Sequence, residues 1–165
     1  MGYGQPDGAM RSDERVHVHA RTNVRSLTPE AIGGPVALSV ADLSFISLAL
    51  VLPALVACTS VDGELIPMVK PQFEVGRELV GAGGVVRDPE LRGQAIQKVA
   101  DRAYELGLGT NGMARIPLPG AAGNLYVFLS PSRAGPPPDP SARPRASAPS
   151  ARRRDRPASA AGPGT

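Results

Sequence analysis

The stretch VKPQFEVGRELVGAGGVVRD at residues 69–88 decides the expected fold. It begins at the end of an apolar run, which predicts a buried strand, and Lys70 follows at once. Pro71 ends that strand because proline has no N–H to give to a sheet. Open α/β sheets place ligands and chemistry at the carboxyl ends of their strands. Lys70 is therefore the first candidate site residue.

A glycine-rich loop and a helix follow. Gly81, Gly83 and Gly84 are not followed by Lys or Ser/Thr at phosphate-loop spacing, so we expect a mobile substrate loop. Asp88-Pro89-Glu90 has the composition of a helix start, with an Asp cap, a first-turn Pro and an acid. The helix is expected to end near Leu106, and its apolar residues recur on one face: Leu91, Ala95, Val99, Ala103 and Leu106.

Upstream of Lys70 the sequence predicts a strand, a helix and a second strand. Val36–Ala41 is an apolar run typical of a strand that is buried on both faces, and Asp42 follows it. The remaining elements are a helix from about Ser44 or Phe45 to Cys58, a turn at Asp62-Gly63 and a strand at Glu64–Val69.

Three further short strands are expected, and together they set the fold class. They are Val16–His19 near one end, and Met113–Ile116 and Leu125–Leu129, which form a hairpin, near the other. Alternating strands and helices predict an α/β protein with a mostly parallel sheet and an antiparallel end. The pattern fits the second half of a doubly wound, Rossmann-like sheet, because no strand with a glycine-rich turn before a helix is found.

Composition changes sharply at residue 131. Residues 131–165 contain no Leu, Ile, Val, Phe or Tyr, so they are expected to be disordered, and the folded domain is expected to span residues 1–130. This segment carries a net charge of +5 while the whole chain carries +3, so basicity belongs to the tail. A solvated tail and a tail that touches nucleic acid without specificity are both compatible with this charge.

Other features argue against metal, disulfide and membrane chemistry. Cys58 is the single cysteine, which excludes an intramolecular disulfide. His17 and His19 share one face of a strand, but no further ligands lie nearby in sequence, so no metal is expected. The uncharged run Leu43–Cys58 is too short to span a bilayer and contains a proline, although a membrane segment is the alternative reading. No signal peptide is visible, which favours the cytoplasm.

Seven segments form an ordered series along the chain: GYGQ at 2–5, DERVHV…RTNVRSLTPE at 13–30, VADLSFISL at 40–48, LPAL at 52–55, VKPQFEVGR at 69–77, GAGGVVRDPELR at 81–92 and PLPG…GN at 117–124. Together they resemble the TlyA-type ribosomal RNA 2′-O-methyltransferases, a family also named haemolysin A and related to the FtsJ-like methyltransferases.

The resemblance implies methyl transfer from S-adenosylmethionine to a ribose hydroxyl of ribosomal RNA, on its own or in ribosomal subunits. The family uses a Lys-Asp-Lys-Glu set, in which Asp42 matches the Asp and Lys70 matches the second Lys. Thr22, Asn23 and Asp42 are expected on the cofactor side, although a turn role for the first two is an alternative. Arg77, Arg87 and Arg92 are expected to meet RNA phosphates or only to solvate the surface.

The chain also departs from the family pattern. No lysine precedes Lys70, no glycine-rich cofactor loop and no S4-like RNA-binding domain are found, and Tyr126 stands where the family has its Glu. We therefore expect an N-terminally truncated homologue that is inactive alone, with unpaired strand edges and exposed apolar faces. The alternatives are a non-catalytic RNA- or protein-binding module and a haemolysin-like membrane-active protein.

Overall fold

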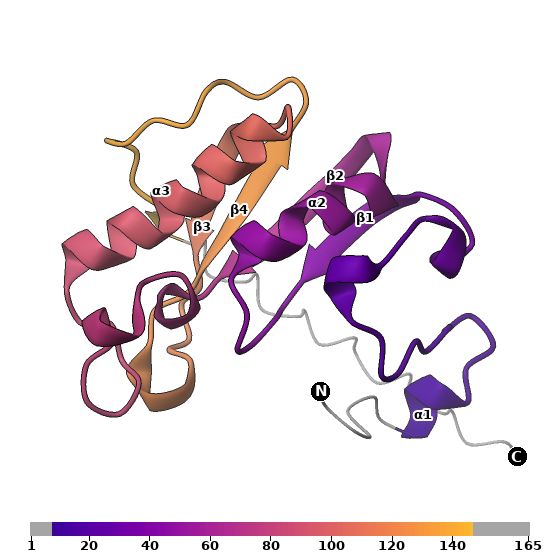
Figure 1. The fold of residues 1–165 in the computed structure, drawn as a ribbon, viewed down its shortest axis with the longest axis horizontal. Coiled ribbons are helices and arrows are strands. Elements are labelled where there is room, and N and C mark those ends of the chain that lie inside the picture. Colours follow the sequence, from indigo (N-terminus) through magenta and orange to yellow (C-terminus); the bar gives the residue numbers. More distant parts are fainter. Residues whose placement is uncertain (1–7, 147–165) are drawn as a thin grey trace, which may run out of the picture.

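The computed structural model describes residues 8–146, which form a five-stranded sheet with two long helices (Figure 1). The elements are α1 (Gly8–Arg11), β1 (Val36–Ala41), α2 (Leu48–Cys58), β2 (Thr59–Val69), α3 (Pro89–Glu105), β3 (Gly109–Arg115), β4 (Val127–Ser132) and β5 (Arg145–Ala146). The strand order is β1-β2-β4-β3-β5. Pairing is parallel for β1–β2 and β3–β5, and antiparallel for β2–β4 and β3–β4. The α/β class with an antiparallel end is confirmed, although the described sheet is mixed rather than mostly parallel.

β1 is an edge strand, which corrects the expected burial on both faces. Leu38 and Val40 are 53% and 61% exposed, whereas Ala41 on the opposite face is 4% exposed. Successive side chains of a strand point to opposite faces, so only the face toward α2 is covered. The expected exposed apolar face and unpaired edge are both present in the described part of the chain.

α2 begins at Leu48, three to four residues later than expected, and Ser47 caps it by accepting a hydrogen bond from Ala49 N at 3.2 Å. The delay leaves residues 42–46 as a loop directly after β1. Within the described residues, no helix is both long and apolar enough to cross a membrane. Most of the apolar run that raised this alternative forms α2, whose Leu48, Val51, Leu52 and Leu55 lie in the core.

β2 is longer than predicted, and the turn expected at Asp62-Gly63 is wrong because both residues lie within the strand. Val36 pairs with Thr59 and Leu38 pairs with Glu64, so the register shifts between these two pairs. Asp62-Gly63 lies in this irregular segment, which the backbone accommodates as a bulge without leaving the strand.

α3 matches its prediction closely. Asp88 accepts a hydrogen bond from Glu90 N at 2.8 Å, and the helix ends at Glu105, before Gly107 with φ 82°. Ala95, Val99 and Ala103 are buried, as the helical spacing required.

The hairpin of β3 and β4 is confirmed, and it continues past residue 130. β4 ends at Ser132, Thr110 N donates to Pro136 O at 2.8 Å, and β5 pairs with β3. Disorder was expected from Pro131, and the structure corrects this for residues 131–146 because the edge of β3 supplies backbone partners that composition does not reveal. The rest of that segment, residues 147–165, lies outside the described residues.

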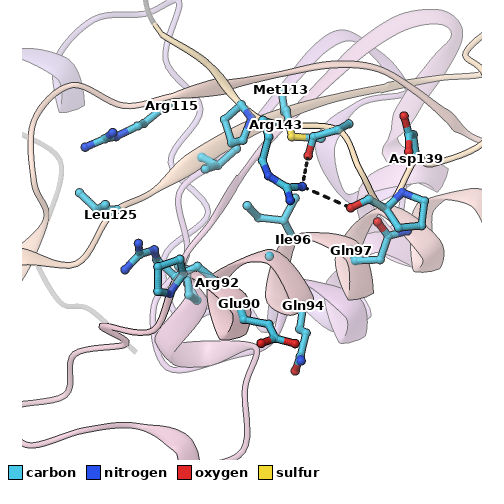
Figure 2. A pocket seen from close by; sticks show the side chains of 17 residues that line it. Glu90, Arg92, Gln94, Ile96, Gln97, Met113, Arg115, Leu125, Asp139 and Arg143 are labelled. Atoms are coloured by element: carbon cyan, nitrogen blue, oxygen red, sulfur yellow. Dashed lines mark hydrogen bonds between the residues drawn. The ribbon is translucent and has the colours of Figure 1, made fainter.

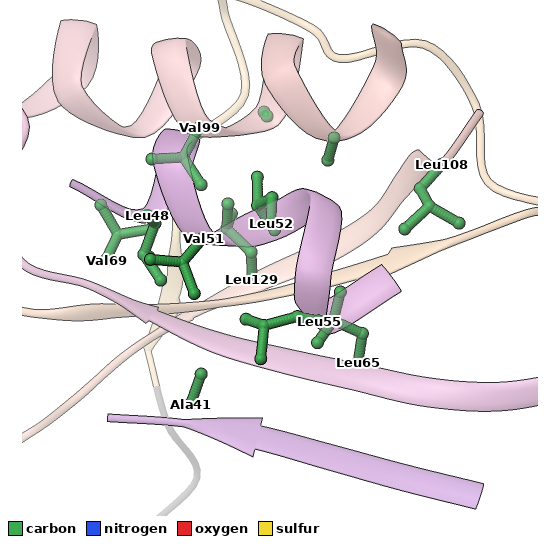
Figure 3. Close-up of a cluster of buried hydrophobic side chains, with 12 residues drawn as sticks. Ala41, Leu48, Val51, Leu52, Leu55, Leu65, Val69, Val99, Leu108 and Leu129 are labelled. Carbon is green, nitrogen blue, oxygen red and sulfur yellow. The ribbon is translucent and has the colours of Figure 1, made fainter. Parts of the chain in front are cut away.

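One hydrophobic core joins both helices to the sheet (Figure 3). Leu48, Val51, Leu52 and Leu55 of α2 meet Val99 of α3 and strand residues that include Leu65, Val69 and Leu129. The two helices therefore cover the same face of the sheet and fix the ends of β1 and β2 relative to α3.

The strand expected at Val16–His19 is wrong. Residues 16–19 have no regular secondary structure, and both histidines are exposed. The short apolar pattern favours a strand, but no strand of the described residues lies beside residues 16–19 to pair with them. The GYGQ segment at 2–5 lies outside the described residues.

Candidate active site

The two predicted catalytic residues lie together because β1 and β2 are parallel neighbours. Asp42 follows β1 and Lys70 follows β2, so both lie at the carboxyl ends of neighbouring strands although they are 28 positions apart in sequence. Lys70 Nζ lies 2.6 Å from Asp42 Oδ1 and donates to Ser44 Oγ at 3.1 Å. The Lys70 side chain is only 11% exposed, whereas that of Asp42 is 62% exposed. The pair is thus buried on the lysine side and open on the carboxylate side.

Tyr126 contributes an aromatic ring to the same site. Lys70 Nζ lies 5.3 Å from the ring centroid, within cation–π range. Gln72 Nε2 donates to the Tyr126 hydroxyl at 3.1 Å. Gly120 lies so close to the ring that any side chain at this position would overlap it. Tyr126, which the resemblance led us to expect at the family's Glu position, therefore lies beside Lys70 and brings a phenol ring to it.

The loop between β1 and α2 is backed by a second aromatic contact. Phe45 has φ 62° and is 92% exposed, and its ring centroid lies 5.2 Å from that of Phe73. A positive φ is unfavourable for a bulky residue, and such outliers gather at functional loops. Two contacts, Phe45–Phe73 and Asp42–Lys70, therefore hold the loop after β1 against the loop after β2.

Glu74 is a buried acid that the sequence analysis did not single out. Its side chain is 4% exposed, Ser47 Oγ donates to Oε2 at 2.5 Å, and Leu48 N donates to Oε1 at 2.7 Å. Burial raises the pKa of Glu74, while these hydrogen bonds and the nearby Lys98 lower it and only partly offset the burial. Its position in the VKPQFEVGR segment was visible in the sequence, but its burial was not.

The glycine-rich loop is attached to the hairpin turn by Asn124. This residue is 3% exposed, accepts from Val86 N at 3.1 Å and donates to Gly84 O at 2.9 Å. Gly83 and Gly84 have φ of 76° and 75°, a conformation that suits glycine. The base of the loop is held, and mobility of its tip stays a prediction.

The three arginines expected to meet RNA differ in their surroundings. Arg87 donates to Ala82 O at 3.3 Å, and Arg92 donates to Arg87 O at 2.7 Å and Val86 O at 3.3 Å. Both side chains therefore brace the backbone of the glycine-rich loop. Arg77 is exposed at the start of the short helix η4 (Arg77–Leu79).

The residues expected on the cofactor side have a local structural role. Asn23 caps the short helix η1 (Val24–Ser26) by accepting from Arg25 N at 3.1 Å, and Thr22 Oγ1 donates to Ala20 O at 3.4 Å. This is the turn role that the sequence left open, and cofactor contact by Thr22 or Asn23 stays a prediction. In the part of the chain that the structure describes, no group of three or more His, Cys, Asp or Glu is arranged to hold a metal ion.

A cavity of about 590 Å³ lies between α3 and the β3–β4 hairpin (Figure 2). Ile96, Met113 and Val127 give it an apolar lining, and residues 139–144 line another side. Arg143 donates to carbonyls of its own segment, including Ser141 O at 3.0 Å. Pro71 is the member of the cavity lining next to Lys70. The sequence analysis missed this cavity because it had assigned residues 139–144 to disorder.

Known proteins share both the sequence and the fold. A family model described as FtsJ-like methyltransferase matches residues 1–130. The 16S/23S rRNA (cytidine-2′-O)-methyltransferase TlyA of Mycobacterium tuberculosis is 60% identical over 129 residues, which cover 78% of this chain and 48% of that protein. The Bacillus subtilis protein YqxC, named as a candidate rRNA methyltransferase, is 38% identical over 130 residues, covering 78% and 46%.

Solved structures agree with these relatives. A protein from Lactococcus lactis described as a candidate hemolysin has a TM-score of 0.76 and 38% identity, with 81% of this chain and 64% of that chain covered. A similarly described protein from Streptococcus thermophilus has a TM-score of 0.77 and 32% identity, covering 85% and 52%. This chain spans about half the length of the curated relatives it matches. The resemblance inferred from the sequence is confirmed, and the chain belongs to the FtsJ-like methyltransferase family.

Proposed function

We propose that the Asp42–Lys70 pair is the ribose-activating part of an RNA 2′-O-methyltransferase site, with S-adenosylmethionine as the cofactor and ribosomal RNA as the substrate. The observation that carries the proposal is the 2.6 Å contact between these side chains at the ends of adjacent parallel strands. The 60% identical relative is named a 16S/23S rRNA 2′-O-methyltransferase, which supports the substrate class. Since ribosomal RNA is the substrate, we expect the protein to act in the cytoplasm.

The chemistry follows from the charges of the pair. A ribose hydroxyl is a poor nucleophile, and the cofactor supplies an electrophilic methyl group on a sulfonium cation. The Lys70 ammonium donates to the hydroxyl oxygen and stabilises the negative charge that develops there. Asp42 Oδ1 holds Lys70, and the exposed Asp42 carboxylate is available to accept the proton that the hydroxyl releases. Holding the hydroxyl in line with the methyl group supplies much of the remaining acceleration.

The residues present fit the cofactor at one point. The Asp42 carboxylate is 62% exposed beside Lys70, so it can face a cation such as the sulfonium. The contacts of Asn23 and Thr22 support a turn and give no such support to a cofactor role. Of the three residues expected on the cofactor side, Asp42 is therefore the one whose exposed charge best supports contact with the cofactor.

Tyr126 predicts a slower reaction than the family pattern would give. A carboxylate beside Lys70 would add a second negative charge to orient the ammonium, whereas Tyr126 offers only its ring face. Arg77, which is exposed, is the arginine we propose for RNA phosphate contact. Arg87 and Arg92 shape the loop that faces the RNA through their bonds to its carbonyls.

The proposal is tested by transplanting the site. Residues 1–130 replace the matching segment of the Mycobacterium tuberculosis relative, and methyl transfer from labelled S-adenosylmethionine to 16S and 23S RNA in ribosomal subunits is measured. We expect 2′-O-methylation by the chimera, and more of it when Tyr126→Glu is introduced. A well-folded chimera that transfers no methyl group with either residue at position 126 contradicts the proposal.

A second candidate, a non-catalytic RNA-binding module, is favoured by Tyr126 at the Glu position. Here the arginines of residues 147–165 would supply affinity without sequence preference. Removing residues 147–165, which leaves β4 and β5 intact, should then abolish RNA binding by the 165-residue chain. Retained binding, or methyl transfer that depends on Lys70, argues against this candidate.

A further inference from the structure

We propose that Glu74 is a positioning residue that holds the Asp42–Lys70 pair in register by tying the loop after β2 to the loop after β1. The inference rests on the proposed function for its catalytic meaning, but its structural content can be tested without methyl transfer. Nothing in the sequence pattern of Lys70 and Asp42 required a second acid at this place.

The geometry begins with the two loops that carry the pair. Residues 42–47 connect β1 to α2, and they contain Asp42 and Ser44, the two partners of Lys70 Nζ. Residues 70–74 follow β2, with the short helix η3 (Pro71–Phe73) in the middle. Glu74 stands at the far end of the second loop and reaches back to the far end of the first. The two loops are therefore joined by the ion pair at one end and by the hydrogen bonds of Glu74 at the other.

Both oxygens of the carboxylate are used in this link. Oε2 accepts from Ser47 Oγ at 2.5 Å and Oε1 accepts from Leu48 N at 2.7 Å, at the N-terminus of the 11-residue helix α2. A helix N-terminus favours a negative charge because its first N–H groups have no partner within the helix. The main-chain carbonyl of Glu74 in turn accepts from Lys98 Nζ of α3 at 2.7 Å. One residue thus connects the Lys70 loop to both helices of the core.

Because Glu74 is buried, its carboxylate depends on these two hydrogen bonds. At 4% exposure the carboxylate cannot be hydrated, so loss of either donor leaves a buried acceptor without a partner. Movement of residues 42–47 away from residues 70–74 would break these bonds together with the Phe45–Phe73 contact. The ion pair and the Glu74 bonds are therefore expected to form and open together.

The chain offers a direct readout because Lys70 and Lys98 are its only lysines. Trace acylation with acetic anhydride, followed by mass spectrometry of the two lysine peptides, reports the accessibility of each amine in the folded 165-residue chain. In Glu74→Gln we expect Lys70 to react faster by about twofold to thirtyfold, the range that coupling through a packed network usually gives. Lys98 keeps its hydrogen bond to the main-chain carbonyl and loses only the nearby Glu74 charge, so its rate is expected to change less than that of Lys70.

Three matched variants define the outcome. Asp42→Asn removes the partner of Lys70 directly and sets the full increase in its rate. Ser47→Ala removes one donor to Glu74 and should give an intermediate increase, which preserves the test if Glu74→Gln does not fold. Glu90→Gln changes an exposed acid in the first turn of α3 and should change neither rate.

Unchanged Lys70 reactivity in both Glu74→Gln and Ser47→Ala, while Asp42→Asn raises it, would show that Glu74 only stabilises the fold and would overturn the proposal. If the Lys70 rate is unchanged in Asp42→Asn, the ion pair does not protect Lys70, and the proposal is contradicted. Increased Lys70 reactivity without methyl transfer by the chimera would support the positioning role and reject the catalytic one.

Discussion

At the scale of the residue, Lys70 has its position because it directly follows the buried strand β2, which ends before Pro71. Its ammonium contacts the Asp42 carboxylate and the Ser44 hydroxyl of the loop after β1, and the Tyr126 ring from the segment before β4. The sequence predicted Lys70 because it stands directly after an apolar run, and Asp42 because the resemblance matches it to the family's Asp. It could not reveal Glu74 as a site residue, because nothing in a local pattern shows that a charged side chain is buried and bonded to the start of a helix 26 positions away.

Gly120 tests the packing of the ring beside Lys70. A methyl group at position 120 would overlap the Tyr126 ring, so we expect Gly120→Ala to lower the free energy of unfolding by about 1–3 kcal/mol. Gly93 in α3 has nothing within 4 Å of the equivalent position, so Gly93→Ala should raise stability by about 0.5–1 kcal/mol. Urea unfolding of the two variants measures both changes. Equal effects of the two substitutions would contradict the described contact between Gly120 and Tyr126.

Glu74 predicts a pH dependence of stability. Its pKa is raised in the folded chain above the ordinary value of 4.5, chiefly by burial, so the folded state holds its proton to higher pH than the unfolded state does. The stability that this proton contributes is fully present below pH 4.5 and is lost as the pH rises through the raised pKa. The stability difference between the wild type and Glu74→Gln should therefore shrink over that interval in urea titrations. A difference that grows with pH would mean that the folded-state pKa is lowered.

At the scale of the element, local signals predicted what local forces determine. α3 was predicted well because its cap, its first-turn proline and its apolar spacing all agree. The N-terminus of α2 was misplaced because residues 42–46 are held as a loop by Lys70 and Phe73, which are distant in sequence. The strand at residues 16–19 failed since pairing needs a neighbour, and composition at 131–146 did not show the open edge of β3.

The cap of α3 gives a prediction at this scale. Asp88→Ala removes the acceptor for Glu90 N and should lower the free energy of unfolding by about 1 kcal/mol. Asp62→Ala, at an exposed position in the irregular part of β2, is the matched control and should change stability by less than about 0.5 kcal/mol. Thermal unfolding followed by circular dichroism compares the two. If Asp62→Ala lowers the free energy of unfolding as much as Asp88→Ala does, the effect at Asp88 does not come from helix capping.

At the scale of the whole molecule, the two helices cover one face of the sheet and leave the other face open at β1. Leu38 and Val40 are more than half exposed on an edge strand whose outer backbone groups pair with no other strand in the described residues. Exposed apolar edge strands promote association between chains. This arrangement follows from the place of β1 in the strand order, which the alternation of the sequence alone did not reveal.

The open face predicts concentration-dependent self-association of the chain. Val40→Lys places a charge on the exposed face of the edge strand and should reduce association in sedimentation velocity experiments. Leu118→Lys is the control, since Leu118 is 75% exposed but lies outside the strands. If both substitutions reduce association equally, general charge and not the β1 edge accounts for the effect.

The central claim is that the Lys70–Asp42 pair activates a ribose hydroxyl, and the lysine content of the chain allows a direct test. Methyl transfer to ribosomal RNA is measured for the chimera with Lys70→Met, with Asp42→Asn and with Lys98→Met, which removes the other lysine but leaves the pair in place. We predict a loss of about 10²–10³-fold in rate for Lys70→Met and a comparable loss for Asp42→Asn. The loss for Lys98→Met should be far smaller, because it removes only the hydrogen bond to the Glu74 carbonyl. Methylation that survives Lys70→Met at the rate of the unsubstituted chimera would contradict the account.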